Sequence, residues 1–228
     1  MNIKKSILSL TKVQIVIWVV SVLAIFASFL WARSEDYMTV AASLVGATAL
    51  IFLAKGDALG QLLSIVFALL YAVISFKCRY YGEMITYLGM TLPSAAVAMI
   101  NWIRNPYAEC EVKVAEMTGR KWLLLITSSV LVTAVMGVVL WYFDTANLLF
   151  STISVTTSYF ASMLTIFRSP YYAVAYAFND IVLIILWTLM TWGNLDYLPM
   201  VICFVVFLVN DLYGFANWQG MKKKQGSW

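Results

Sequence analysis

The segment VVFLVNDLYGFANW, residues 205–218, begins as an apolar run and ends with several polar side chains. Its polar and amphipathic residues are Asn210, Asp211, Tyr213, Asn217 and Trp218. A carboxylate near the centre of a bilayer costs about 2.5–3.5 kcal/mol even on the lenient insertion scale, so it normally faces a protein interior or a water-filled cavity. The segment therefore predicts a membrane-spanning helix that presents a polar face to a helix bundle.

The composition of the whole chain agrees with a membrane protein. Of 228 residues, 63% are hydrophobic and 11% are charged, and the apolar residues form long runs. A helix needs about 20 apolar residues to cross the hydrocarbon layer, because each residue adds about 1.5 Å. The sequence therefore predicts an all-α polytopic membrane protein. Its eight expected spans are 13–32, 37–54, 58–76, 84–103, 122–143, 145–167, 170–192 and 197–217.

The basic residues predict the orientation of these spans. We expect span 13–32 to be retained as a transmembrane helix, because its apolar run is too long for a signal peptide. With eight spans and both termini in the cytoplasm, the inner segments hold Lys4, Lys5, Lys12, Lys55, Arg104, Lys113, Arg120, Lys121, Arg168, Lys222, Lys223 and Lys224. The outer segments then hold only Arg33, Lys77 and Arg79. The positive-inside rule favours this arrangement. The net charge of +4 adds a small attraction to anionic lipid heads and does not indicate a nucleic-acid partner.

Several chemistries lack their usual residues. Cys78, Cys110 and Cys203 are scattered without CxxC spacing, so they predict neither a zinc site nor a redox pair. The chain has no histidine, which is the commonest general base and metal ligand, and it has no P-loop motif. We therefore expect no enzyme activity, no metal and no cofactor.

The two halves of the chain resemble one another. The stretch AVAMINW (96–102) closes the fourth span and LYGFANW (212–218) closes the eighth. Two spans precede each of them, and each half has a short basic turn, AKGDALGQ (54–61) or FRSPYYAV (167–174). This pattern predicts a parallel 3+1+3 repeat, one of the ways in which transporters are built. The predicted parts are an extra N-terminal helix at 13–32, a first bundle at 37–103, a cytoplasmic loop and linker helix at 104–143, and a second bundle at 145–218.

Polar residues recur on one side of each of the last three spans. On the seventh span, a helical rotation of about 100° per residue gathers Tyr172, Tyr176, Asn179, Asp180, Leu183 and Trp187 on one face. On the eighth, one face holds Cys203, Phe207, Asn210, Gly214 and Asn217, with Asp211 and Trp218 at its margin. On the sixth, a hydroxyl stripe holds Ser151, Ser154, Ser158, Ser162 and Thr165.

Each polar face also has a structural interpretation. Ser and Thr often serve close helix packing or bond the backbone, and a single Asn can link two helices. Trp187 suits packing as well as a site, and the third-span residue Gln61 can simply bond a facing helix. The acids Asp180 and Asp211 have no Lys or Arg in their spans, so they are either a site, or protonated or bonded to neighbouring helices.

This set of side chains indicates a class of ligand. Acids without basic partners favour a cation, Tyr and Trp faces attract flat or positively charged rings, and amides and hydroxyls match the hydroxyls of a sugar. The residues predict an aromatic, hydroxylated small molecule, with a nucleoside and a vitamin both open.

The motifs of the chain resemble those of the bacterial nicotinamide riboside transporters of the Pnu type. The resemblance rests on AKG (54–56), LLYAVISFKCRYYGE (69–83), YLGMTLP (87–93), RSPYYAVAYAFNDIVLIILW (168–187) and YLPMVICFVVFLVNDLYGFANW (197–218). It implies the 3+1+3 fold of the SWEET-like vitamin transporters in the inner membrane, often as a homotrimer. It also implies nucleoside uptake by facilitated diffusion, trapped by a cytoplasmic kinase.

The resemblance also implies residue roles. Asn179 and Asn210 match amides that the family places at its central site, and Trp187 and Tyr176 match its aromatic face. We therefore expect the amides to bond the sugar, the aromatic residues to stack on the ring, and Asp180 or Asp211 to meet its charge. Gln61, Tyr213 and Asn217 complete the predicted set of substrate-binding residues.

Two positions depart from the pattern of the family. Phe67 replaces an amide, and Ala95 stands where glutamine is common. Both fall where the first half is expected to touch substrate. The alternatives are therefore a thiamine or deoxynucleoside transporter, or a substrate-binding membrane subunit that depends on a separate ATPase.

Overall fold

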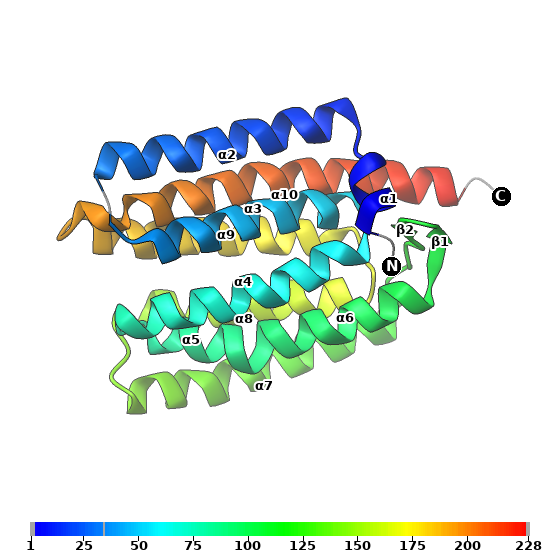
Figure 1. Ribbon diagram of the computed structural model, residues 1–228. Coiled ribbons are helices and arrows are strands. Elements are labelled where there is room, and N and C mark those ends of the chain that lie inside the picture. Colours follow the sequence, from blue (N-terminus) through cyan, green and yellow to red (C-terminus); the bar gives the residue numbers. More distant parts are fainter. Residues whose placement is uncertain (1–2, 34, 227–228) are drawn as a thin grey trace.

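The computed structural model describes residues 3–33 and 35–226, which form a bundle of long helices (Figure 1). The helices are α1 (Ile3–Leu8), α2 (Lys12–Ala32), α3 (Tyr37–Lys55), α4 (Ala58–Lys77), α5 (Tyr81–Thr86), the π-helical turn η1 (Tyr87–Thr91), α6 (Leu92–Arg104), α7 (Gly119–Tyr142), α8 (Leu148–Ile166), α9 (Tyr171–Thr191), the 3₁₀ turn η2 (Leu195–Tyr197) and α10 (Leu198–Gln225). Within the described residues, eight segments are long and apolar enough to cross a membrane. The predicted helical membrane architecture is confirmed.

The ends of the spans coincide with capping residues. Asp36 caps α3 by accepting the backbone N–H groups of Met38 and Thr39. Asp57 caps α4 in the same way through Leu59 N–H, at 3.0 Å. Such caps satisfy backbone donors that the helix itself leaves free. Each helix therefore begins close to where the charged residues divide the apolar runs.

The fourth span is interrupted near its middle. Pro93 lies at the start of α6 and lacks the N–H group that a continuous helix needs. Its ring also crowds the carbonyl four residues earlier, at Gly89. The backbone accommodates this proline by forming the π-helical turn η1 directly before α6. On the two sides of this interruption, Tyr87 of η1 and Ala95 and Ala98 of α6 are buried in the bundle, whereas Leu88 and Val97 are exposed.

Six helices form a closed ring. In order, α3 packs on α4, α4 on α6, α6 on α8, α8 on α9 and α9 on α10, and α10 returns to α3. The remaining two spans lie outside this ring, where α2 packs on α3 and α10, and α7 packs on α8 (Figure 1). Most of the surface of α2 and α7 is exposed and apolar, as a lipid-facing helix requires.

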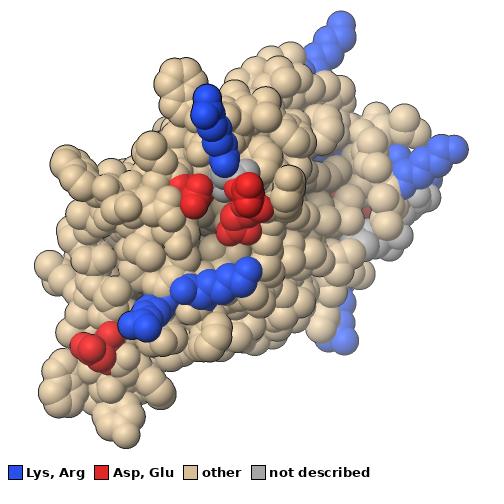
Figure 2. Space-filling model, turned by 60° about the vertical axis from the view of Figure 1, so that its left-hand side comes forward, with Lys and Arg blue, Asp and Glu red and all other residues tan. Residues whose placement is uncertain are grey.

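The two ends of the bundle differ. At one end, called the Lys55 end, lie the turns between α3 and α4 and between α8 and α9, together with α1, the end of α10 and a short hairpin (Figure 1). The hairpin pairs β1 (Pro106–Ala108) with β2 (Glu111–Val112), and Val112 N–H bonds Gly56 O at 2.9 Å. It lies in the segment that we expected to be a loop, and its strands are too short to show a strand period. The opposite end, called the Lys77 end, carries the turn after α4, and Figure 2, in which this end comes forward, shows acidic side chains gathered between basic ones on that face.

The first Asn-Trp pair ties the end of α6 to the end of α8. Asn101 Nδ2 donates to Ile166 O at 2.7 Å, and Trp102 Nε1 donates to Thr165 O at 3.1 Å. The last carbonyls of a helix have no partner within the helix, so these bonds cap α8 from outside.

The second Asn-Trp pair does the same for α10 and α3. Asn217 Nδ2 donates to Ala54 O at 2.8 Å, and Trp218 Nε1 donates to Leu53 O at 2.9 Å. The Trp218 ring packs on Trp102 with centroids 5.3 Å apart. The last helix of each half therefore caps the first helix of the other half.

Candidate functional site

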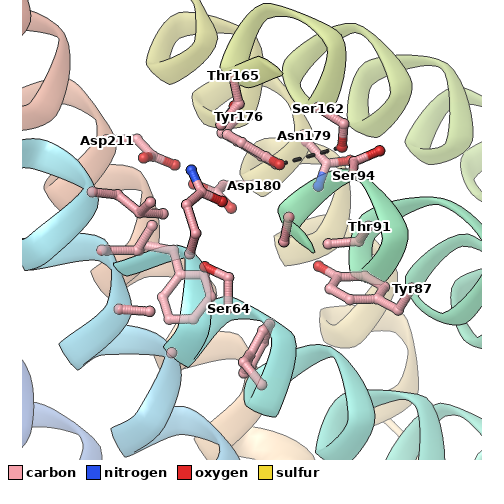
Figure 3. A pocket seen from close by; sticks show the side chains of 18 residues that line it. Ser64, Tyr87, Thr91, Ser94, Ser162, Thr165, Tyr176, Asn179, Asp180 and Asp211 are labelled. Carbon is pink, nitrogen blue, oxygen red and sulfur yellow. Dashed lines mark hydrogen bonds between the residues drawn. The ribbon is translucent and has the colours of Figure 1, made fainter. Parts of the chain in front are cut away.

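A cavity lies inside the ring of six helices (Figure 3). Side chains from α3, α4, η1, α6, α8, α9 and α10 line it. None of its 18 lining residues is Lys or Arg. A concave site with apolar walls and a few converging polar groups is the usual form of a small-molecule site.

Two carboxyl groups converge on the cavity from neighbouring helices. Asp180 on α9 and Asp211 on α10 both line it, and each residue is 3% exposed. The two groups lie close enough to interact with one another. No ion pair within the described residues reaches either of them, and Asp180 Oδ2 has no hydrogen-bond partner there. Such a pair is expensive to bury unless a proton or a cationic ligand neutralises it.

The hydroxyl stripe of α8 orients Asn179. Asn179 Oδ1 accepts hydrogen bonds from Ser154, Thr157 and Ser158, at 3.2, 2.8 and 3.0 Å. These donors occupy the amide oxygen, so the Nδ2 group is left for a ligand in the cavity. The stripe continues with Ser162, which lines the cavity and lies 3.4 Å from the Tyr176 hydroxyl (Figure 3).

The first half of the chain supplies the facing wall. Gln61 on α4 lines the cavity, and its buried Nε2 has no hydrogen-bond partner within the described chain. Phe67 lies on the same helix and packs on Phe207, with ring centroids 5.3 Å apart. A Cβ atom at Gly46 would overlap the Phe207 ring, so a glycine is needed for this close approach.

An aromatic layer closes the Lys77 side of the cavity. We call Tyr71, Tyr80, Trp187 and Phe204 the Lys77-end layer. Trp187 Nε1 donates to Tyr71 OH at 2.7 Å, and the Tyr71 ring packs edge-on against Phe204. Burial raises the pKa of Tyr80 to about 12, so its hydroxyl stays protonated and donates to Leu186 O at 3.0 Å. All four rings are almost completely buried.

A second aromatic layer closes the Lys55 side. It comprises Trp102, Tyr172 and Trp218, which are fully or nearly fully buried. Along α9, Tyr172 precedes the cavity residues Tyr176, Asn179 and Asp180, and Trp187 of the other layer follows them. The cavity is therefore enclosed between two aromatic layers.

Comparisons with known proteins place this architecture in a family. A family model described as "Nicotinamide mononucleotide transporter" matches residues 36–220. The chain belongs to this family. The nicotinamide riboside transporter PnuC of Neisseria mucosa is 28% identical over 91% of this chain and 81% of its own length. The PnuC of Haemophilus influenzae is 22% identical over 86% of each chain.

A solved structure has the same overall fold. The crystal structure of the vitamin B3 transporter PnuC superimposes with a TM-score of 0.82, covers 94% of both chains and is 26% identical in sequence. The family resemblance that the sequence motifs indicated is confirmed. The chain is thus a member of a family of multi-pass membrane transporters.

The structure brings five of the predicted site residues together. Tyr176, Asn179, Asp180, Asp211 and Gln61 all line the cavity of this family member. Residues from both halves of the chain meet there.

The two positions at which the sequence interpretation expected a departure from the family pattern also line the cavity. Phe67 on α4 and Ala95 on α6 both lie in its wall. A change of side chain at either position would therefore alter the wall of the cavity.

The other four predicted residues lie outside the cavity. Trp187 belongs to the Lys77-end layer. Asn210 is buried and donates to Ser21 Oγ and to Val206 O, and its Oδ1 has no hydrogen-bond partner within the described chain. Tyr213 and Asn217 border a surface hollow at the Lys55 end. Contact of these four residues with substrate stays a prediction.

Tyr87 and Glu83 are among the polar residues to which the sequence interpretation assigned no role. Tyr87 on η1 lines the cavity, but in the sequence it belongs only to a motif that carries the family resemblance. Glu83 is fully buried on α5, one residue before the start of the expected span at 84–103. The signal that could have found it is an acid directly adjoining an apolar run.

Proposed function

We propose that this chain carries nicotinamide riboside across the bacterial inner membrane by facilitated diffusion. The observation that carries the proposal is the pair Asp180 and Asp211, which is buried without a basic partner among the described residues, in a cavity enclosed by six helices. The nicotinamide ring of the riboside bears a positive charge, which would neutralise the pair. The relatives named nicotinamide riboside transporter support this substrate.

The cavity favours the riboside over the mononucleotide that the family description names. A phosphate monoester is recognised by Arg, Lys or the N-terminus of a helix. The lining offers no Lys or Arg, and it places two carboxyl groups where they would repel the phosphate. A nucleoside without phosphate suits the same walls.

The lining residues suggest how the substrate lies. The ring would sit beside Asp180 and Asp211, against the aromatic faces of Tyr176 and Phe207. The Nδ2 group of Asn179 would then bond the ribose, whose hydroxyls can also accept from other amide donors of the wall. Phe67 and Ala95 would decide whether a riboside, thiamine or a deoxynucleoside fits best.

The order of the ring supports the parallel 3+1+3 repeat. The helices α3, α4 and α6 follow one another, and α8, α9 and α10 follow in the same order. In each half, the Asn-Trp pair on the last helix bonds the end of the first helix of the other half, so the two halves make equivalent contacts. Alternating access would come from rocking one three-helix group against the other, with the two aromatic layers opening in turn.

The wider setting follows from the positive-inside rule and the family. Most basic residues lie at the Lys55 end, which we assign to the cytoplasm together with both termini. A cytoplasmic kinase would trap the product, and the transporter would work as a homotrimer without a cofactor. The exposed apolar faces of α2 and α7 are available to membrane lipid and to neighbouring subunits.

Calorimetric titration of the purified protein tests the substrate. We expect nicotinamide riboside to bind at least about tenfold more tightly than nicotinamide mononucleotide, a difference of about 1.4 kcal/mol. Thiamine and deoxyuridine serve as the competing ring systems. Tighter binding of thiamine or deoxyuridine would show that the cavity is the binding site of a different substrate. Tighter binding of the mononucleotide would contradict the claim that the two carboxyl groups repel a phosphate.

A further inference from the structure

Glu83 is a buried acid that the proposed substrate site does not use. It lies on α5, its side chain is 0% exposed, and neither carboxylate oxygen has a hydrogen-bond partner within the described part of the chain. The Ser154 side chain on α8 interacts with the carboxyl group without reaching hydrogen-bond geometry. An ionised carboxylate in this position would bear the full cost of desolvation.

No basic group among the described residues forms an ion pair with Glu83. The titratable groups close enough to be affected by a charge on Glu83 are Tyr71 on α4, Tyr80 in the turn and Tyr87 on η1. From α8 it faces the hydroxyl of Ser154, and α7 contributes aliphatic contacts such as Leu140 beside Gly82, the residue before it. The neutral acid is the form that this environment accepts.

The position of Glu83 connects it to the closure of the Lys77 end. Two members of the Lys77-end layer, Tyr71 and Tyr80, lie close enough to Glu83 that a charge on its carboxyl group acts on them. The layer is held by the bond from Trp187 Nε1 to Tyr71 OH. If these rings separate to admit a substrate, water reaches Glu83 as well. Ser154, which interacts with Glu83, also donates to Asn179 in the cavity wall.

We propose that Glu83 is a proton-binding site that holds the Lys77 end of the transporter closed. The carboxyl group carries a proton while the aromatic layer covers it. When the layer opens, water stabilises the carboxylate and the proton leaves from Glu83 Oε to bulk water. Reclosure takes the proton back from the same side. That the Lys77 end faces the outside of the cell rests on the proposed orientation. Proton release from Glu83 on opening does not depend on which substrate is carried.

The sign of the pH effect follows from this exchange. Opening releases one proton, so a rise in pH favours the open state. The equilibrium constant for opening should rise by up to about tenfold per pH unit, over the range in which the closed form is neutral and the open form is ionised.

Thiol labelling of the purified full-length protein in detergent tests the switch. Cys78, Cys110 and Cys203 are first replaced by Ser or Ala, so that the reporters are the only thiols. The reporter is Ser75→Cys, because Ser75 is buried on α4 one turn from Tyr71 toward the Lys77 end. The matched control is Lys77→Cys in a second protein, because Lys77 is exposed on the same helix. The ratio of the two labelling rates cancels the rise of thiolate with pH. We expect this ratio to increase by about tenfold or more between pH 6 and 8.

The Glu83→Gln variant supplies the decisive comparison. Gln has the shape of the neutral acid and cannot ionise, so the ratio should stay low at both pH values. The parent is the same cysteine-replaced protein with Glu83 retained. An equal pH response of the labelling ratio in Glu83→Gln, or a labelling ratio in the parent that does not change with pH, would overturn the proposal. So would a parent ratio that falls when NaCl replaces choline chloride at constant pH, because Na⁺ would then be the ion bound. If Glu83→Gln does not fold, the parent ratio in the two salts still supports or overturns the proposal.

Discussion

Asn179 shows how a single residue in a membrane helix becomes a binding group. An amide alone could simply link two helices. Here three hydroxyls of α8 hold the Oδ1 atom, so the group has one orientation, and its Nδ2 group donates to no other side chain in the part of the chain that the structure describes. The hydroxyl stripe of α8 therefore does more than allow close helix packing, because it determines that Asn179 presents a hydrogen-bond donor to the cavity.

Asn179 and Asn210 make a matched pair for mutation. Both are buried asparagines on adjacent helices, but Asn179 lines the cavity and Asn210 bonds Ser21 on α2. We expect Asn179→Leu to weaken binding of nicotinamide riboside at least about tenfold and Asn210→Leu to weaken it less. Calorimetry measures the affinity, and thermal unfolding in detergent checks that both variants fold. An equal or larger loss for Asn210→Leu would show that Asn210 contacts substrate in another state of the transport cycle.

At the scale of the helices, the crossed caps connect the two halves. The end of α6 bonds the end of α8, and the end of α10 bonds the end of α3. The Asn bonds satisfy the carbonyls of Ile166 and Ala54 at the helix ends. The Trp bonds add a second donor to Thr165 O and Leu53 O, which also accept backbone N–H groups of the following turn. These contacts fix the spacing of the halves at the Lys55 end, next to the aromatic layer there.

Removal of one cap should lower stability without changing the cavity. Asn217→Ala removes the bond to Ala54 O and leaves a carbonyl unpaired, so we expect a loss of about 1 kcal/mol in the free energy of unfolding. The control is Gln219→Ala on the same helix, whose side chain forms no hydrogen bond within the residues that the structure describes. Unfolding in detergent measures both. A loss no larger than that of the control would mean that Asn217 has no capping role.

At the scale of the whole molecule, a closed ring with a central cavity should transport without an energy source. Liposomes that contain only this chain should take up nicotinamide riboside in a saturable way until the inner and outer concentrations are equal. ATP inside the liposomes should change neither the rate nor the final level. Uptake that requires an added ATPase would instead support the alternative of a substrate-binding subunit. Empty liposomes give the background.

The sequence predicted the membrane spans well because their signal is local. Apolar runs, basic residues and the Asn-Trp repeat locate eight helices without knowledge of their packing. The helical face of span seven likewise placed Tyr176, Asn179 and Asp180 together, since a helix fixes the relative directions of its own residues.

The part of the site that the sequence did not predict depends on packing between helices. Asn210 lies near Asp211 in the chain, but it points to α2 while Asp211 points into the cavity. Trp187 shares the face of Asp180, but it lies two turns nearer to the Lys77 end and packs on Tyr71. Which helix faces each side chain, and at what depth, follows from the closure of the ring.

The preference of the cavity for a positive charge can be tested by comparing nicotinamide riboside with its reduced, uncharged dihydro form. The two ligands have nearly the same shape and differ in the charge of the ring. Calorimetry on the parent should show at least about tenfold tighter binding of the charged form. The double variant Asp180→Asn with Asp211→Asn should abolish the difference, while Asp144→Asn, an exposed acid at the Lys77 end, should keep it. Equal affinity of the parent for both ligands would contradict the claim that buried carboxyl groups recognise a cationic nucleoside.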